Sequence, residues 1–142
     1  MTDNDAMPGN SVVAPLRNVL IVEDSPTIAA NLEMAAQQIP GVSVLLAASG
    51  VEALRILEDD TRAIHGIVTD LNMPRMDGFE LIARVRAGQR HGSTPIIVVS
   101  ADTDPSTPLR TQRLGADAFF SKPYSPAQVC RKLEQLLNAS NA

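Results

Sequence analysis

From Arg17 onward, apolar residues follow two alternating patterns. Short and nearly continuous apolar runs are typical of strands that are buried on both faces of a sheet. Between these runs, apolar residues recur every three or four positions, which is the spacing along one face of a helix. The chain is therefore predicted to alternate strand and helix five times. The predicted strands are Val19–Val22, Val42–Ala47, Ile67–Thr69, Ile96–Val99 and Ala118–Phe120.

The predicted helices have recognisable ends. Ser25-Pro26 and Asp104-Pro105 each place an N-cap residue before a proline at the first helical position. Three further N-cap candidates precede a Glu or Gln by three residues, which is the capping-box spacing: Ser49, Asp77 and Ser125. Gly115 suits a left-handed helix end. Pro108 lies where the first turn of the fourth helix is expected, so this helix is predicted to be short or to begin late.

Strands that are joined by helices run parallel, and right-handed crossovers place the helices on both faces of the sheet. The predicted fold is therefore an α/β, doubly wound (βα)5 sandwich of the flavodoxin-like type, with a five-stranded parallel sheet in the order 2-1-3-4-5. Residues 1–16 are predicted to be a flexible N-terminal tail, residues 17–138 the folded domain and residues 139–142 a C-terminal tail.

Composition narrows the class of protein. The chain of 142 residues is 44% hydrophobic but only 3% aromatic, so one aliphatic core is expected. A net charge of −4 argues against direct binding of nucleic acid. The densest basic stretch, Arg84 to His91, is interpreted as helix-end cations that complement the helix dipole. The lone Cys130 excludes an internal disulfide and is read as a core residue.

The sequence also bears on location. No apolar run approaches the roughly 20 residues that a membrane-spanning helix needs. The N-terminal segment carries acids instead of the basic residues that open a secretory signal. The expected location is therefore the cytoplasm, without membrane association.

Chemically active side chains follow four of the five predicted strands. Glu23-Asp24 follows the first strand, Asp70 the third and Ser100 the fourth, and the fifth leads into Lys122-Pro123. Ligands of such sheets bind beyond the carboxyl ends of the strands, so these side chains are expected to converge. Three neighbouring carboxylates repel one another, and Mg²⁺, which prefers carboxylate oxygens, would relieve that repulsion.

This set of groups is suited to receiving a phosphoryl group. The carboxylate of Asp70, at the end of the middle strand, is the predicted nucleophile. Lys122 and Mg²⁺ would neutralise the incoming charge, and Ser100 would hydrogen-bond a phosphoryl oxygen. Any one of these residues alone has an ordinary structural explanation, such as a helix N-cap or a solvated charge. Their succession at four strand ends is what favours a site.

At these residues the sequence resembles the receiver domains of two-component response regulators, over about residues 17 to 138. The segments that carry the resemblance are Val19–Asp24, Asp70–Gly78, Val98–Ala101 and Gly115–Pro123. The resemblance implies that Asp70 is the phosphoacceptor. It also implies a magnesium site formed by Asp24, Asp70 and the backbone carbonyl of Asn72, with Glu23 acting through a metal-bound water.

The resemblance further implies that Lys122 contacts the phosphoryl group and precedes a cis proline, and that Ser100 and Phe119 are the switch residues. Two departures concern the switch: Ser100 stands where Thr is commoner, and Phe119 where Tyr is commoner. Asn72 and Asp102 would flank the phosphoryl site and tune hydrolysis. These departures leave the phosphorylation chemistry in place and bear on how strongly it is coupled to the output surface.

The implied function is phosphorylation-activated signalling. A histidine kinase or histidine phosphotransfer protein would donate to Asp70, and a surface formed by the fourth helix, fifth strand and fifth helix would bind a downstream protein. The residues assigned to that surface are Arg110, Arg113, Phe119, Tyr124 and Arg131. Beyond its own phosphorylation and dephosphorylation, the chain is not expected to be an enzyme.

Two other functions stay open at this stage. A phosphohydrolase of the haloacid-dehalogenase type also phosphorylates an Asp after a strand. The motif of that class is Asp-x-Asp, in which the second acid donates a proton, whereas Asn72 stands at this position here and cannot donate a carboxyl proton. A receiver-fold scaffold that works without phosphorylation would normally lack some site residues. The length leaves no room for an output domain after Asn138, so a free-standing regulator, a phosphorelay intermediate and a receiver cut from a longer protein all fit.

Overall fold

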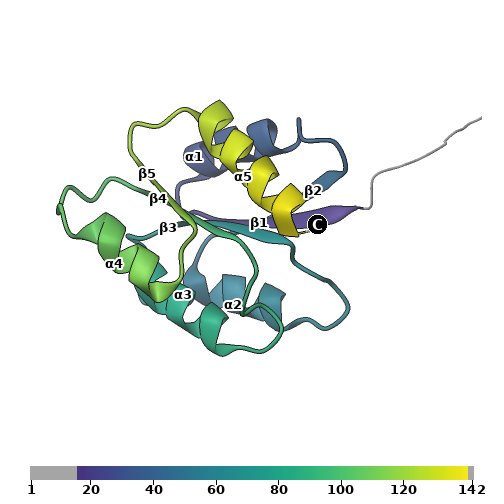
Figure 1. Ribbon diagram of the computed structural model, residues 1–142, viewed down its shortest axis with the longest axis horizontal. Coiled ribbons are helices and arrows are strands. Elements are labelled where there is room, and N and C mark those ends of the chain that lie inside the picture. The colour runs from purple at the N-terminus through teal and green to yellow at the C-terminus, as the bar shows by residue number, and fades with distance from the viewer. Residues whose placement is uncertain (1–15, 141–142) are drawn as a thin grey trace, which may run out of the picture.

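The structure, a computed structural model, describes residues 16–140. Five strands and five helices alternate along this part of the chain, as Figure 1 shows. The strands are β1 (Arg17–Val22), β2 (Val42–Ala47), β3 (Gly66–Asp70), β4 (Ile96–Ser100) and β5 (Ala118–Ser121). The helices are α1 (Pro26–Ala36), α2 (Gly50–Glu58), α3 (Gly78–Ala87), α4 (Thr107–Leu114) and α5 (Pro126–Ser140).

The predicted domain boundaries agree only in part with the first and last elements of the structure. The predicted tail, residues 1–16, lies outside the described residues except for Leu16. At the other end, α5 continues through Ser140, so it enters the segment 139–142 that was predicted to be a tail. No helix within residues 16–140 combines the length and the apolar character needed to cross a membrane.

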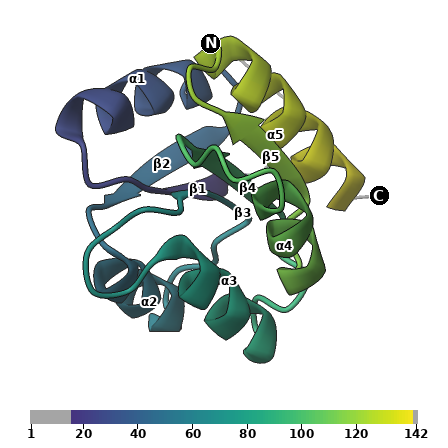
Figure 2. The same ribbon diagram turned by 90° about the vertical axis from the view of Figure 1, so that its left-hand side faces the viewer.

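The five strands form one parallel sheet in the order β2-β1-β3-β4-β5, which confirms the predicted topology. Helices α1 and α5 cover one face of the sheet, and α2, α3 and α4 cover the other (Figures 1 and 2). The carboxyl ends of β1, β3, β4 and β5 therefore lie along one edge. The predicted site residues follow the strands at this edge.

Alternate residues of the strands point into two separate hydrophobic clusters, because successive side chains of a strand project to opposite faces. Leu20 and Val22 of β1 pack with the cluster beneath α2 and α3. Val19 and Ile21 pack with the cluster beneath α1 and α5, which also contains Cys130. The lone cysteine is thus the buried core residue that its position predicted.

The prediction of two-sided burial is correct for the three inner strands and wrong for the outer two. Every residue of β3 and β4 is buried, and β1 is nearly so. In β2 and β5 most residues are only partly buried, and Leu46 is exposed. The reason is topological: β2 and β5 are the outermost strands of the sheet, and helices cover the outermost strands less completely.

Most helix starts follow the predicted capping chemistry. The hydroxyls of Ser25, Ser49 and Ser125 accept the backbone N–H groups of Ile28, Glu52 and Gln128, and a carboxylate oxygen of Asp77 accepts that of Glu80. The start predicted for α4 at Asp104-Pro105 is wrong, because the helix begins later, at Thr107, with Pro108 in its first turn. The Asp104 carboxylate instead accepts from the Ser106 N–H and hydroxyl, and so closes a turn before the helix.

One arginine joins two loops, the α3–β4 loop and the α4–β5 loop, on the side of the sheet that carries α3. Nε and Nη2 of Arg86 both donate to the Gly115 carbonyl, at 3.1 and 2.8 Å, and Nη1 donates to the carbonyls of His91 and Thr94. Gly115 ends α4 with a φ of 114°, the left-handed conformation expected of it. Arg86 therefore fixes the C-terminal end of α4 to α3 and to the start of β4.

Candidate functional site

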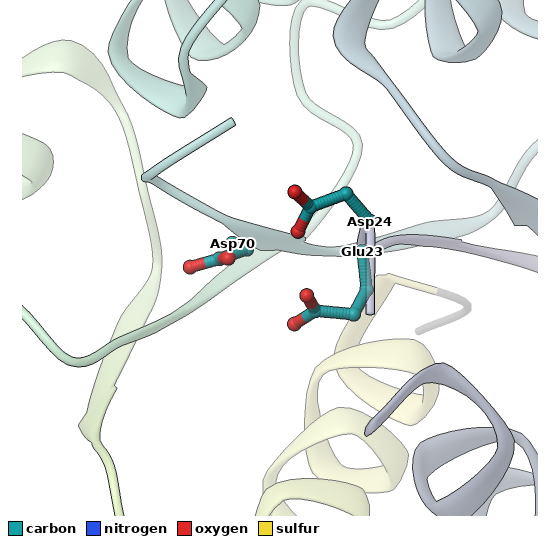
Figure 3. A group of neighbouring side chains, drawn as sticks. All are labelled: Glu23, Asp24 and Asp70. Carbon is teal, nitrogen blue, oxygen red and sulfur yellow. The ribbon is translucent and has the colours of Figure 1, made fainter. Parts of the chain in front are cut away.

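The strand ends bring the three predicted acids together. One oxygen each of Glu23, Asp24 and Asp70 lies within 4.8 Å of the others. Figure 3 shows the three side chains extending in the same direction beyond the ends of β1 and β3. Glu23 and Asp70 are each only 4% exposed, whereas Asp24 is exposed. The expected convergence of carboxylates on one spot is therefore present.

Lys122 supplies the positive charge of this cluster. Its Nζ lies 3.4 Å from Glu23 Oε1 and 3.6 Å from Asp70 Oδ2. The side chain comes from the loop after β5, and the Lys122–Pro123 peptide bond is cis, as the resemblance implied. One ammonium group thus faces two nearly buried carboxylates, which leaves the cluster with an excess of negative charge.

Within this cluster, the ionised form of Glu23 is disfavoured. Burial raises the pKa of this carboxyl, the Ser25 N–H that donates to Oε2 opposes that rise, and the charge of Asp70 adds to it. A buried acid whose ionised form is disfavoured by a neighbouring carboxylate is a site where a cation would bind with net benefit. The all-oxygen donor set is the kind that Mg²⁺ prefers. The residues present therefore fit the metal.

The backbone around Asp70 holds its carboxylate in a defined orientation. Oδ1 of Asp70 accepts the Leu71 N–H at 2.8 Å, and Oδ2 faces Lys122. Gly78 N–H donates to the Leu71 carbonyl, so the start of α3 folds back against the end of β3. A Cβ on Gly78 would overlap the Asp70 carbonyl oxygen and lie 2.7 Å from Leu71 Cα. Only glycine allows the two backbones to approach this closely.

The remaining predicted residues lie at the end of β4, in β5 and in the loop after β3. Ser100 is the last residue of β4, fully buried, and its Oγ accepts the Asp102 N–H at 3.0 Å. Phe119, in β5, is partly buried and packs against the cluster beneath α2 and α3. Asn72 is exposed in the loop that follows Asp70. These placements agree with the predicted positions and leave the roles of the three residues as predictions.

Two residues assigned to the output surface have neighbours that the sequence did not predict. Tyr124, assigned to the output surface, lines one pocket with Lys122, and burial, with the charges of Glu23 and Asp70, raises the pKa of Tyr124 to about 12. The guanidinium of Arg110, assigned to the same surface, stacks 3.8 Å from the ring centroid of Phe79 in α3. The stacking of Arg110 on Phe79 joins segments far apart in the chain, so the sequence alone does not predict it.

Comparison with known proteins agrees with this geometry. The family model for the response regulator receiver domain matches residues 19–134. The chemotaxis protein CheY homolog of Campylobacter jejuni is 30% identical over 123 residues, covering 87% of this chain and 94% of that protein. The two-component response regulator ORR3 of Oryza sativa is 31% identical over 134 residues, covering 92% of this chain and 98% of that protein.

Solved structures lead to the same family. The chemotaxis response regulator CheY4 of Vibrio cholerae superposes with a TM-score of 0.76 at 30% identity, over 85% of this chain and 98% of that one. A response regulator from Chloroflexus aurantiacus gives a TM-score of 0.79 at 29% identity, over 87% and 98% of the two chains. With its acids, its lysine and its strand order in the predicted places, the chain belongs to the receiver domains of two-component response regulators.

Proposed function

We propose that the protein is switched by phosphorylation of Asp70, with Mg²⁺ bound by Asp24, Asp70 and the Asn72 carbonyl and with Glu23 acting through a metal-bound water. The observation that carries the proposal is the meeting of three carboxylates and Lys122 at one edge of the sheet. Bound there, Mg²⁺ would neutralise the acids together with the oxygens of the incoming phosphoryl group.

In the proposed reaction, the Asp70 carboxylate forms a bond to phosphorus as the P–N bond of a phosphohistidine breaks, and the electron pair leaves with the imidazole nitrogen. The donor would be a histidine kinase or a histidine phosphotransfer protein. Leu71 N–H holds Oδ1, so the carboxylate is oriented before the donor arrives. Lys122 stays beside Oδ2 and offsets the added negative charge.

The modification adds charge and acceptor oxygens next to Ser100. The Ser100 hydroxyl would then donate to a phosphoryl oxygen, and Phe119 would move toward the space that Ser100 leaves. Both residues lie on the strands that adjoin α4 and α5, the proposed docking face for the downstream protein. The partly apolar groove between α4 and β5, which Leu109 and Phe119 line, belongs to this face.

The proposal is tested by incubating the full chain with acetyl phosphate, with Mg²⁺ or with EDTA. We expect one phosphoryl group per chain, located by mass spectrometry on the peptide that contains Asp70, and no modification in EDTA. Modification at another residue would contradict the assignment. Steady hydrolysis of a generic phosphomonoester in Mg²⁺ would favour the phosphohydrolase instead, and a chain that acetyl phosphate leaves unmodified would favour the scaffold.

Replacing Lys122 by Ala is expected to slow phosphorylation by acetyl phosphate without moving its location. Lys122 is the cation that faces Asp70, and losing a charge that stabilises a transition state costs about 10²-fold when the site is closed. Because the side chain is 20% exposed, we expect a loss of about tenfold to 10²-fold. Lys132→Ala, in the middle of α5, is the matched control and should leave the rate unchanged. A Lys122→Ala rate equal to that of the parent would contradict this role.

A further inference from the structure

One side chain spans the connection between β4 and α4. The backbone N–H of Asp102 donates to Ser100 Oγ at 3.0 Å. The carboxylate of Asp102 accepts twice: Oδ1 from the Asp104 N–H at 2.9 Å and Oδ2 from the Thr107 hydroxyl at 3.1 Å. Asp102 therefore contacts both the last residue of β4 and the first residue of α4.

The bond to Ser100 leaves the proton of that hydroxyl available. A serine hydroxyl has one proton to donate and two lone pairs to accept with. One lone pair of Ser100 accepts from Asp102, and the hydroxyl donates to no residue within 16–140. A fully buried donor without a protein acceptor, at the rim of the acid cluster, is costly unless a ligand takes the proton. Ser100 can thus donate to a phosphoryl oxygen without releasing Asp102.

The bond to Thr107 is a main attachment of the start of α4. The N-cap residue, Ser106, makes no capping hydrogen bond with its side chain in the described structure. Thr107 is 3% exposed, and its hydroxyl donates to Asp102. A carboxylate at this position also complements the positive end of the helix dipole. The next attachment along the helix is the stacking of Arg110 on Phe79.

We propose that Asp102 is a positioning residue that couples Ser100 to the first turn of α4. This inference rests on the proposed function, since the phosphoryl group is what would displace Ser100. A shift of Ser100 toward the phosphoryl group carries the Asp102 N–H with it. The carboxylate of the same residue then moves, and Thr107 and the start of α4 follow. In this role the Asp102 carboxylate, which accepts from Asp104 and Thr107, acts on α4.

The sharpest test compares two threonines of the same helix. Thr107 and Thr111 are both buried, and each hydroxyl donates one hydrogen bond, but Thr111 donates to Pro108 within its own helix. The replacement by valine removes only the hydroxyl, so Thr111→Val is the matched control for Thr107→Val. The probe is beryllofluoride with Mg²⁺, and the readout is the NMR shift of two sets of amides, Leu71 at the site and Arg110 with Arg113 in α4.

In the parent and in Thr111→Val, we expect beryllofluoride to shift both sets of amides. In Thr107→Val the Leu71 shift should persist, while the α4 shifts should fall by about twofold or more, since the hydrogen bond that transmits the displacement is gone. Asp102→Ala should behave like Thr107→Val. Asp102→Asn should restore the coupling, because its oxygen can accept from Asp104 and its amide can donate to the Thr107 hydroxyl.

The outcomes separate the two proposals. Full α4 shifts in Thr107→Val and in Asp102→Ala would overturn the coupling role while leaving the phosphorylation site intact. A parent protein in which beryllofluoride shifts neither set would overturn the proposed function, and the coupling role with it. Equal loss of α4 shifts in Thr111→Val would mean that helix stability, not the Asp102 contact, sets the response, and this too would reject the inference.

Discussion

Replacing Asp70 by Asn is expected to abolish phosphorylation by acetyl phosphate while leaving the fold intact. The amide has no carboxylate oxygen to form the bond to phosphorus. Its oxygen can still accept the Leu71 N–H, so the local backbone is retained. The measurement is the mass of the chain after incubation with acetyl phosphate and Mg²⁺. Asp77→Asn, in the loop that follows Asp70, is the control, because asparagine is as good an N-cap as aspartate and labelling should persist.

Asp70→Asn should also show whether Mg²⁺ stabilises the protein by binding at Asp70. Without Asp70 the Glu23 carboxyl loses a repelling neighbour, and its pKa should move down toward the usual value. In EDTA we therefore expect Asp70→Asn to be at least as stable to urea as the parent. Mg²⁺ should stabilise the parent by binding the folded state and should stabilise the variant much less. Labelling of Asp70→Asn at the parent's level, or equal stabilisation of both proteins by Mg²⁺, would refute the assigned site.

Replacing Gly78 by Ala is expected to lower the free energy of unfolding by about 3 kcal/mol, since the added methyl group overpacks the structure. The atoms that the methyl group would meet are backbone atoms of Asp70 and Leu71, which cannot rotate away as a flexible side chain can. Relief requires α3 to move away from the end of β3. Because that backbone carries the acceptor carboxylate, phosphorylation should also slow by about 10²-fold, the cost of a displacement near 1 Å.

Gly88→Ala provides the comparison for this variant. A Cβ on Gly88 would meet its nearest atom, the Val85 carbonyl oxygen, at 3.5 Å, an ordinary contact. Its φ of −79° suits any residue. Urea unfolding should therefore give nearly the parent value for Gly88→Ala and a clearly lower midpoint for Gly78→Ala. Equal midpoints would show that the approach of α3 to β3 is looser than the structure indicates.

The sequence was sufficient to predict the fold and the members of the acid cluster. Parallel strands interleaved with helices leave little choice of topology, and residues at strand ends must share one edge of the sheet. Glu23, Asp24 and Asp70 could be brought together by that reasoning alone. Pro108 likewise predicts the late start of α4, although the N-cap residue of the helix is Ser106 and not Asp104.

What the sequence could not reveal are contacts between side chains far apart in the chain. Arg86 lies in the basic stretch interpreted as helix-end cations, yet its guanidinium is largely buried and binds two loops. The stacking of Arg110 on Phe79 is of the same kind. Such contacts depend on the packing angle between helices, which the periodicity of one segment does not determine.

The attachment made by Arg86 has a mechanical consequence for α4. The C-terminal end of this helix is pinned, since two nitrogens of Arg86 donate to the Gly115 carbonyl. The other end is held by the hydrogen bond of the Thr107 hydroxyl, and one turn further on by the stacking of Arg110 on Phe79. A helix that is held strongly at one end and weakly at the other rotates about the strongly held end. We therefore expect α4 to rotate about Gly115, with a displacement that increases toward Thr107.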